Sequence, residues 1–150
     1  MPTFVLALTN RRELVDGAIL RPGRLEAHVE VPLPDEAGRA AILKIHAEQM
    51  RASGRLRLDD KNPFGGDGCV VEQVDEASYD DWVAGVAAKT DGFSGASMAA
   101  VVRAAVARAL DRSVAADDVF ACSVTGADFD SAIIDVRQSS VSAADYFEEL

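Results

Sequence analysis

Hydrophobic residues follow a strand-like pattern at the start of the chain. Residues 4–8 are continuously apolar, which is typical of a buried parallel strand, and residues 27–31 alternate like a strand covered on one face. Between them, residues 13–20 follow a helical pattern that Pro22 and Gly23 would end. The pattern predicts two strands and a short helix, although two strands alone do not form a stable sheet.

From residue 35 the spacing of apolar residues becomes helical. It predicts a long helix with Asp35 as N-cap and Gly54 as terminator, whose apolar positions are Ala37, Ala40, Ala41, Leu43, Ile45, Ala47 and Met50. Residues 55–78 are rich in glycine and acidic residues and have little periodicity, so we expect a loop there. A shorter helix is expected at 79–89.

Two further helices are expected in the second half of the chain. Ser94 would cap an alanine-rich helix that continues to about residue 112. Residues 124–125 could form a brief extended element, and residues 127–136 a last helix with Phe129, Ile133 and Ile134 facing inward.

These elements predict an α/β part followed by a mostly helical part. We assign residues 1–33 to the first part, 34–136 to a small helical domain and 137–150 to a polar tail or linker. At 150 residues, nearly half of them hydrophobic, the chain can bury one core of ordinary size.

Composition narrows the classes of partner. A net charge of −10 argues against binding to nucleic acid or to an anionic membrane surface. Cys69 and Cys122 are far apart in sequence and show no metal-binding spacing, so we expect reduced thiols and no metal site. No apolar run is long enough to cross a membrane, and we expect a cytoplasmic protein without membrane insertion.

Polar residues with possible phosphate chemistry follow the first apolar run. Asn10 comes directly after Thr9 at the expected carboxyl end of a strand, where α/β sheets bind ligands. Arg21 and Arg24 lie on a stiff Pro-Gly turn, and guanidinium groups bind phosphate oxygens well. Taken singly, Thr9-Asn10 is more often a turn starter, and two arginines in a turn are more often ordinary solvated surface.

Together, residues 6–11 and 16–26 resemble the second region of homology of AAA+ ATPases. The resemblance implies an α/β remnant of a P-loop AAA+ core in residues 1–33 and an AAA+ lid after it. It also implies that Asn10 is the sensor-1 residue, which reads the γ-phosphate in its own subunit. Arg21 and Arg24 would be arginine fingers that reach the nucleotide of a neighbouring subunit.

The same resemblance continues into the helical part through residues 33–46 and 93–96. It implies that Ile42 packs on adenine, that His46 contacts the base or ribose, and that Gly95 and Ala96 lie against the nucleotide. Outside this frame, a histidine on a helix is usually incidental, and Ser94 alone explains a capped helix start.

The chain has no Gly-x-x-x-x-Gly-Lys-Ser/Thr and no apolar strand ending in Asp-Glu. It therefore lacks the groups that cradle phosphates and hold Mg²⁺ in P-loop ATPases. We expect ATP with Mg²⁺ as cofactor of the parent module, no tight nucleotide binding by this chain alone, and no ATP hydrolysis by it.

Within the AAA+ family, residues 33–39, 50–51, 93–96 and 102–105 look most like the first ATPase domain of the vesicle-fusing branch, which disassembles SNARE complexes. That implies neighbouring subunits of a hexameric ring, and a SNARE complex with its adaptor, as partners. The alternatives are a segment of a valosin-containing type of unfoldase, or a short regulatory or interaction domain without catalysis. The chain contains no His-Glu-x-x-His motif, so these residues give no support to a membrane-bound protease of this family.

Overall fold

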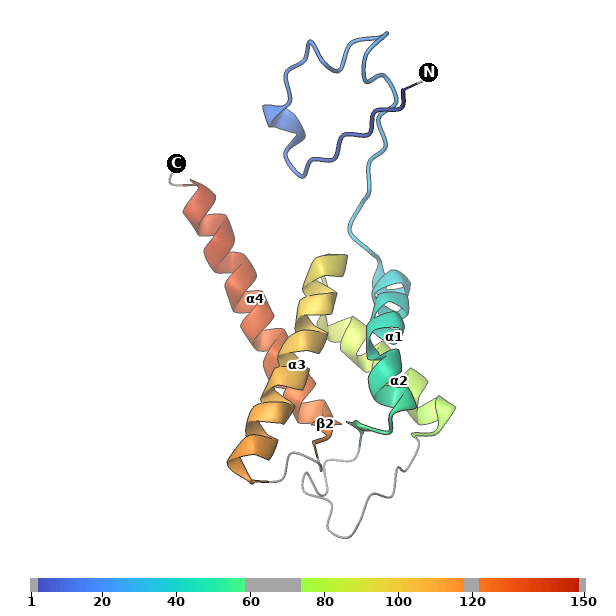
Figure 1. Ribbon diagram of the computed structural model, residues 1–150, viewed down its shortest axis with the longest axis vertical. Coiled ribbons are helices and arrows are strands. Elements are labelled where there is room, and N and C mark those ends of the chain that lie inside the picture. The colour runs from blue at the N-terminus through green and yellow to red at the C-terminus, as the bar shows by residue number, and fades with distance from the viewer. Residues whose placement is uncertain (1–2, 59–73, 118–121, 149–150) are drawn as a thin grey trace. The chain divides into compact units, whose positions relative to one another are not determined.

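The computed structural model describes residues 3–58, 74–117 and 122–148, with side chains described as far as Ser139 in the last range. The chain divides into two compact units, Met1–Pro32 (unit 1) and Leu33–Leu150 (unit 2), and each is described by itself. The elements, labelled in Figure 1 where there is room, are η1 (Arg12–Leu14), α1 (Glu36–Ala52), β1 (Leu56–Arg57), α2 (Glu76–Lys89), α3 (Gly95–Ala115), β2 (Val124–Thr125) and α4 (Gly126–Glu148).

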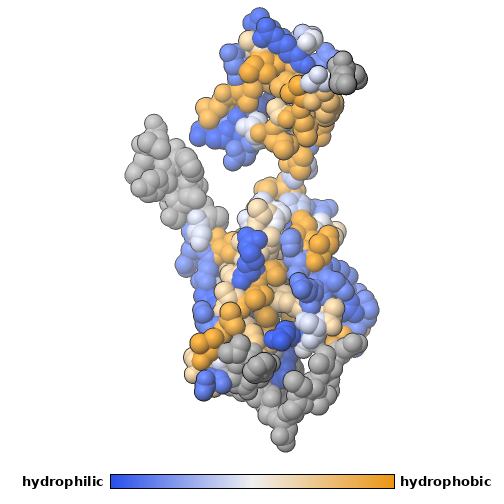
Figure 2. Space-filling view, viewed as in Figure 1, coloured by the Kyte–Doolittle hydropathy of each residue, from blue (hydrophilic) through white to orange (hydrophobic). Residues whose placement is uncertain are grey.

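Unit 1 has no β-strand among its described residues, so the strands predicted at 4–8 and 27–31 are wrong for this chain. Phe4 and Val31 are 88% and 87% exposed, and Figure 2 shows hydrophobic residues over much of the surface of this unit. A strand needs neighbouring backbone to pair with and a layer to cover it, and unit 1 supplies neither to these segments. The helix predicted at 13–20 is reduced to the single turn η1.

Helix α1 begins and ends as predicted. The Asp35 carboxylate accepts a hydrogen bond from the N–H of Gly38 at 2.7 Å, and Gly54 leaves the helix with φ +63°. Leu43 is buried, but Ile45 is 74% exposed, so its assignment to the apolar face was wrong. Two residues correspond to about 200° around a helix, which turns Ile45 away from the face of Leu43.

Helices α2 and α3 also begin at polar caps. The α2 helix begins three residues before the predicted start, because the Asp75 carboxylate accepts the N–H of Ser78 at 3.0 Å. The Ser94 hydroxyl accepts the N–H of Ser97 at 3.2 Å, which confirms the predicted cap of α3. This helix continues past the predicted end to Ala115.

A small parallel sheet joins two distant parts of unit 2. Leu56 of β1 lies opposite Val124 of β2, and the N–H of Val124 donates to the carbonyl of Arg55 at 2.7 Å. The extended element at 124–125 is confirmed, whereas β1 and the start of α2 lie inside the predicted loop 55–78. Leu56 and Arg57 lie in a stretch with little hydrophobic periodicity, so the sequence pattern did not indicate β1. Residues 59–73 of that loop lie outside the described residues.

Helix α4 lies beside α3 (Figure 1) and helps to close the core. It extends beyond the predicted end at 136 to Glu148, through the segment predicted to be a polar tail. Phe129 and Ile133 are buried as expected, but Ile134 is 57% exposed. The ring of Trp82 meets Phe129 edge to face at 4.8 Å between centroids. The largest fully buried side chains are Tyr79, Phe129, Leu43, Leu56 and Met98.

Candidate functional site

The predicted site residues fall in both units. Asn10, Arg21 and Arg24 belong to unit 1, and the predicted lid residues Ile42, His46, Gly95 and Ala96 belong to unit 2.

The turn that carries Arg21 and Arg24 is held by backbone hydrogen bonds. The N–H of Arg24 donates to the carbonyl of Arg21, and the N–H of Leu25 donates to the carbonyl of Ile19, both at 3.1 Å. Gly23 has φ +85°, a left-handed conformation that favours glycine. We call residues 19–25 the finger turn.

The two arginines of the finger turn differ in their surroundings. The Arg24 guanidinium donates through Nη1 to the carbonyl of Ala18 at 3.0 Å, so part of it stabilises the turn. Arg21 is exposed, and no acceptor among the described residues is hydrogen-bonded to its guanidinium. The Glu26 carboxylate accepts the N–H of Gly23 at 3.1 Å and braces the turn from the other side. A pre-shaped turn of this kind can present a cation to an anionic ligand.

Asn10 lies at the end of the exposed segment that begins unit 1. The hydroxyl of its neighbour Thr9 accepts the N–H of Arg11 at 3.0 Å, as in a local turn. Arg11 in turn pairs with Glu13 at 3.2 Å. The turn-starter interpretation therefore applies to Thr9, while Asn10 is exposed next to it.

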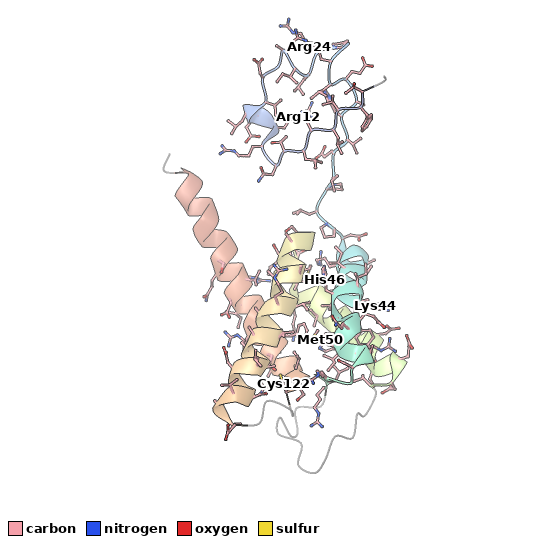
Figure 3. All side chains as sticks on the ribbon, in the orientation of Figure 1. Arg12, Arg24, Lys44, His46, Met50 and Cys122 are labelled. Carbon is pink, nitrogen blue, oxygen red and sulfur yellow. The ribbon has the colours of Figure 1, made fainter. Side chains whose placement is uncertain are left out.

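Two predicted lid residues that are far apart in sequence lie next to each other. A Cβ atom built on Gly95, at the start of α3, would lie 3.7 Å from Cδ1 of Ile42 on α1. His46 follows Ile42 by one helical turn on the same side of α1 and is exposed (Figure 3). The structure thus brings Ile42 and Gly95 together, with His46 one turn further along α1.

The start of α3 offers backbone donors beside this contact. The first helical hydrogen bond of α3 is made by the N–H of Met98 to the carbonyl of Ser94 at 3.0 Å. The N–H groups of Gly95 and Ala96 precede it and have no acceptor within the helix. The half-buried Ile42 side chain lies beside the start of α3 with these backbone donors, and such a combination can hold a ring that carries hydrogen-bond acceptors.

Arg39 on α1 was not predicted as a site residue, and it is only 5% exposed. Its guanidinium donates to the carbonyl of Ala87 from Nε and Nη2 at 3.2 and 3.0 Å, and to the carbonyl of Pro34 from Nη1 at 3.1 Å. The Oδ1 atom of Asp91 lies 3.7 Å from Nη1 of Arg39, and the Asp91 side chain is almost fully exposed. Because Arg39 comes one turn before the buried Leu43, its position on the apolar face could have signalled a buried arginine.

A second arginine joins α3 to the start of α4. Arg112 donates to the carboxylate of Asp128 and to the carbonyl of Ser123 at 2.8 Å. The other Asp128 oxygen accepts the N–H and the hydroxyl of Thr125, at 2.9 and 3.0 Å. Burial raises the pKa of Asp128, but the hydrogen bonds from Arg112 and Thr125 outweigh it and hold this pKa below its usual range.

Neither a metal site nor a membrane span is found in the described part of the chain. Residues 3–58, 74–117 and 122–148 contain no cluster of three or more histidine, cysteine or acidic side chains that could hold a metal ion. Within the same ranges, no helix combines the length and the apolar character needed to cross a bilayer.

Comparison with known proteins identifies related sequences, although no protein-family model matches the chain. The chain is 35% identical to the vesicle-fusing ATPase of Arabidopsis thaliana, in an alignment that covers 97% of this chain and 18% of that protein. It is 37% identical to the vesicle-fusing ATPase of Caenorhabditis elegans, over 87% of this chain and 14% of that protein. It is 39% identical to a cell division cycle protein 48 homologue of Archaeoglobus fulgidus, over 67% of this chain and 10% of that protein. The chain therefore spans less than a fifth of the length of these curated relatives.

Proposed function

The chain belongs to the AAA+ ATPase family, and we propose that it is the rear part of an ATPase module similar to that of the vesicle-fusing ATPases. In this proposal, unit 1 supplies Asn10 as sensor 1 and Arg21 and Arg24 as arginine fingers. Unit 2 is the lid, which contacts the nucleotide through Ile42, His46, Gly95 and Ala96.

The observation that carries the proposal is the contact between Ile42 and Gly95. These residues come from different helices, and a Cβ on Gly95 would lie 3.7 Å from Ile42 Cδ1. A glycine here leaves the backbone open to close approach beside an apolar side chain. Such a surface suits the adenine end of ATP, with His46 within one turn to contact the base or the ribose.

The finger turn supports a role for the arginines at a neighbouring subunit. An arginine finger stabilises the charge that develops during transfer of the γ-phosphoryl group, so it must be presented by a stiff element. The hydrogen bonds within residues 19–25 provide that stiffness, and Arg21 is exposed. The natural partner is therefore another AAA+ subunit, and a hexameric ring is the assembly that we propose for the parent module.

ATP with Mg²⁺ would be the cofactor of the complete module. The sequence has no P-loop to cradle the β- and γ-phosphates and no strand ending in Asp-Glu to hold the ion. We therefore propose that this chain by itself hydrolyses no ATP. Release of phosphate by the purified chain, at a rate that falls when Arg21 and Arg24 are both replaced by alanine, would contradict this.

Disassembly of SNARE complexes with the help of an adaptor, in the cytoplasm, is the biological role we propose for the parent protein. The names of the two vesicle-fusing relatives support a role in vesicle fusion. The SNARE substrate, the adaptor and the cytoplasmic location follow only from the resemblance to the vesicle-fusing branch. The match to the cell division cycle protein 48 homologue favours a second candidate, a segment of a valosin-containing type of unfoldase.

A chimera tests the proposed site residues. Residues 3–148 would replace the aligned segment of the Arabidopsis vesicle-fusing ATPase, and ATP turnover would be measured. Because an arginine finger is worth on the order of 10³-fold or more in turnover, replacing both Arg21 and Arg24 by alanine should reduce kcat by about that factor. ATP binding should be retained.

The matched control is Arg12→Ala, since Arg12 is an exposed arginine of unit 1 outside the finger turn. It should leave kcat unchanged. Equal turnover in the chimera and in its Arg21→Ala, Arg24→Ala variant would refute the finger assignment. Turnover lost equally in the Arg12 variant would refute it as well.

A further inference from the structure

One buried cation in unit 2 has a role that packing alone does not explain. Arg39 is 5% exposed, and the only carboxylate within 4.0 Å of its guanidinium in the described part of the chain, that of Asp91, is nearly fully exposed. Burying a charge without a buried counter-charge is costly unless dipoles replace the lost water. The carbonyl groups of Ala87 and Pro34 provide those dipoles.

The two carbonyls belong to different segments of unit 2. Pro34 lies in residues 33–35, which we call the connecting segment because it leads from unit 1 into α1. The Ala87 carbonyl lies in the last turn of α2, where the helix dipole favours a positive charge. One guanidinium therefore ties the connecting segment to the end of α2.

The end of α2 leads directly into the turn that presents the lid residues. The Thr90 hydroxyl bonds to the same Ala87 carbonyl at 3.1 Å, and the N–H of Phe93 bonds to the carbonyl of Thr90 at 3.1 Å. Gly92 has φ +75°, and Ser94 then caps α3. Residues 90–94, the presenting turn, thus form a short hydrogen-bonded link from the Arg39 site to Gly95.

The connecting segment is also packed closely against α1. A Cβ on Gly38 would lie 3.0 Å from Asp35 Oδ1 and 3.1 Å from Pro34 Cβ, which is closer than ordinary contact. Two hydrogen bonds fix this segment to α1: the N–H of Gly38 donates to the Asp35 carboxylate, and the Arg39 guanidinium donates to the Pro34 carbonyl. A displacement of the presenting turn therefore has a direct route to the connecting segment through Arg39.

We propose that Arg39 is a positioning residue that couples the presenting turn, and hence Gly95 and Ala96, to the connecting segment. Its consequence for ATP turnover rests on the proposed function, whereas the coupling itself is a property of unit 2. Arginine suits this position because it donates from three separate nitrogens of a planar fork, whereas the three donors of a lysine ammonium share one nitrogen and do not match that spread.

The coupling is tested in the full chain by a nitroxide at position 33. Leu33 is 61% exposed, so Leu33→Cys with Cys69→Ser and Cys122→Ser gives a single labelling site. Arg39→Met should narrow the electron paramagnetic resonance lines of this label. The matched control is Arg112→Met, since Arg112 also bridges a carbonyl and a carboxylate in unit 2 but lies on α3, away from the connecting segment. It should leave the lines unchanged.

Two results would overturn the coupling: unchanged lines in Arg39→Met, or equal narrowing in Arg112→Met. If circular dichroism shows that Arg39→Met does not fold, Arg39→Lys takes its place. That variant keeps the charge but reaches one carbonyl, and it should mobilise the label as well; an immobile label in it would refute the requirement for the fork.

The functional consequence is tested in the Arabidopsis chimera. Because a misplacement of about 1 Å far from the chemistry can cost on the order of 10²-fold in rate, Arg39→Met should reduce kcat by about tenfold or more. The KM for ATP should change little, and Arg112→Met should affect neither constant. An unchanged kcat would refute the functional part. If the parent chimera itself has no turnover, the proposed function fails, and the nitroxide measurement still decides the coupling.

Discussion

Replacement of Gly95 by alanine separates a glycine kept for ligand approach from a glycine kept for packing. The added Cβ would lie 3.7 Å from Ile42 Cδ1, which is ordinary van der Waals contact. Gly95 is the first residue of α3 and does not have a positive φ. The folded protein therefore has room for the methyl group and no backbone strain to oppose it.

The expected change in stability follows from helix propensity. Alanine at a compatible position stabilises by about 0.4–1 kcal/mol, because it reduces the freedom of the unfolded chain. For a protein of this size, that corresponds to a rise in melting temperature of about 1–4 °C. Urea unfolding followed by circular dichroism measures the change in the free energy of unfolding in the isolated chain. A loss of more than about 1 kcal/mol would contradict the room for a methyl group at Gly95.

The expected change in nucleotide binding has the opposite sign. One extra methyl group in a close-fitting site costs about 1–3 kcal/mol, or roughly 10- to 200-fold in affinity. In the chimera, Gly95→Ala should raise the KM for ATP by about that factor. Gly85→Ala is the control, since Gly85 lies inside α2, is exposed and has nothing within 4 Å of its built Cβ. It should stabilise equally and leave the KM unchanged; an unchanged KM in Gly95→Ala would refute the proposed contact with the nucleotide.

Three further predictions concern unit 2. Because the folded-state pKa of Asp128 lies below the unfolded value of about 3.9, its stabilising effect is complete above that value and is lost as the pH falls through the folded-state pKa. Asp128→Asn should lower the free energy of unfolding at pH 7 by about 1.5–3 kcal/mol and reduce the slope of stability against pH below pH 4, in urea titrations; an unchanged slope would contradict this. Leu43→Ala should lower the free energy of unfolding by about 2–5 kcal/mol, and Ile45→Ala by less than about 0.5 kcal/mol, because Leu43 is fully buried and Ile45 is 74% exposed. Equal losses in the two variants would show that the buried face of α1 is misassigned. Gly92→Ala should destabilise by about 1 kcal/mol or more in the same assay, because Gly92 has φ +75°, and a neutral result would argue against that conformation.

Local chemistry explains why the helix starts could be predicted. Asp35 and Ser94 cap their helices through their own side chains, so the information lies within three or four residues of sequence. The missed residues have the opposite character. Arg39 bonds to Ala87, 48 positions away, and no spacing rule connects two such positions.

The prediction of strands in unit 1 is wrong for a related reason. Residues 4–8 have the composition of a buried strand, but composition states only what a segment would do when paired and covered. Phe4 and Leu8 remain exposed because the described part of unit 1 provides no neighbouring strand. Burial depends on other segments, and a period in one segment carries no information about them.

Sequence alone therefore determined the caps of α1 and α3, part of the buried faces of α1 and α4, and the family motifs around Arg21 and Arg24, because each depends on residues close together in the chain. Tertiary structure decided that Ile42 meets Gly95, that β1 pairs with β2 and that Arg39 joins the connecting segment to the end of α2. These contacts arise where helices pack, and packing brings together residues whose separation along the chain is set by the fold as a whole.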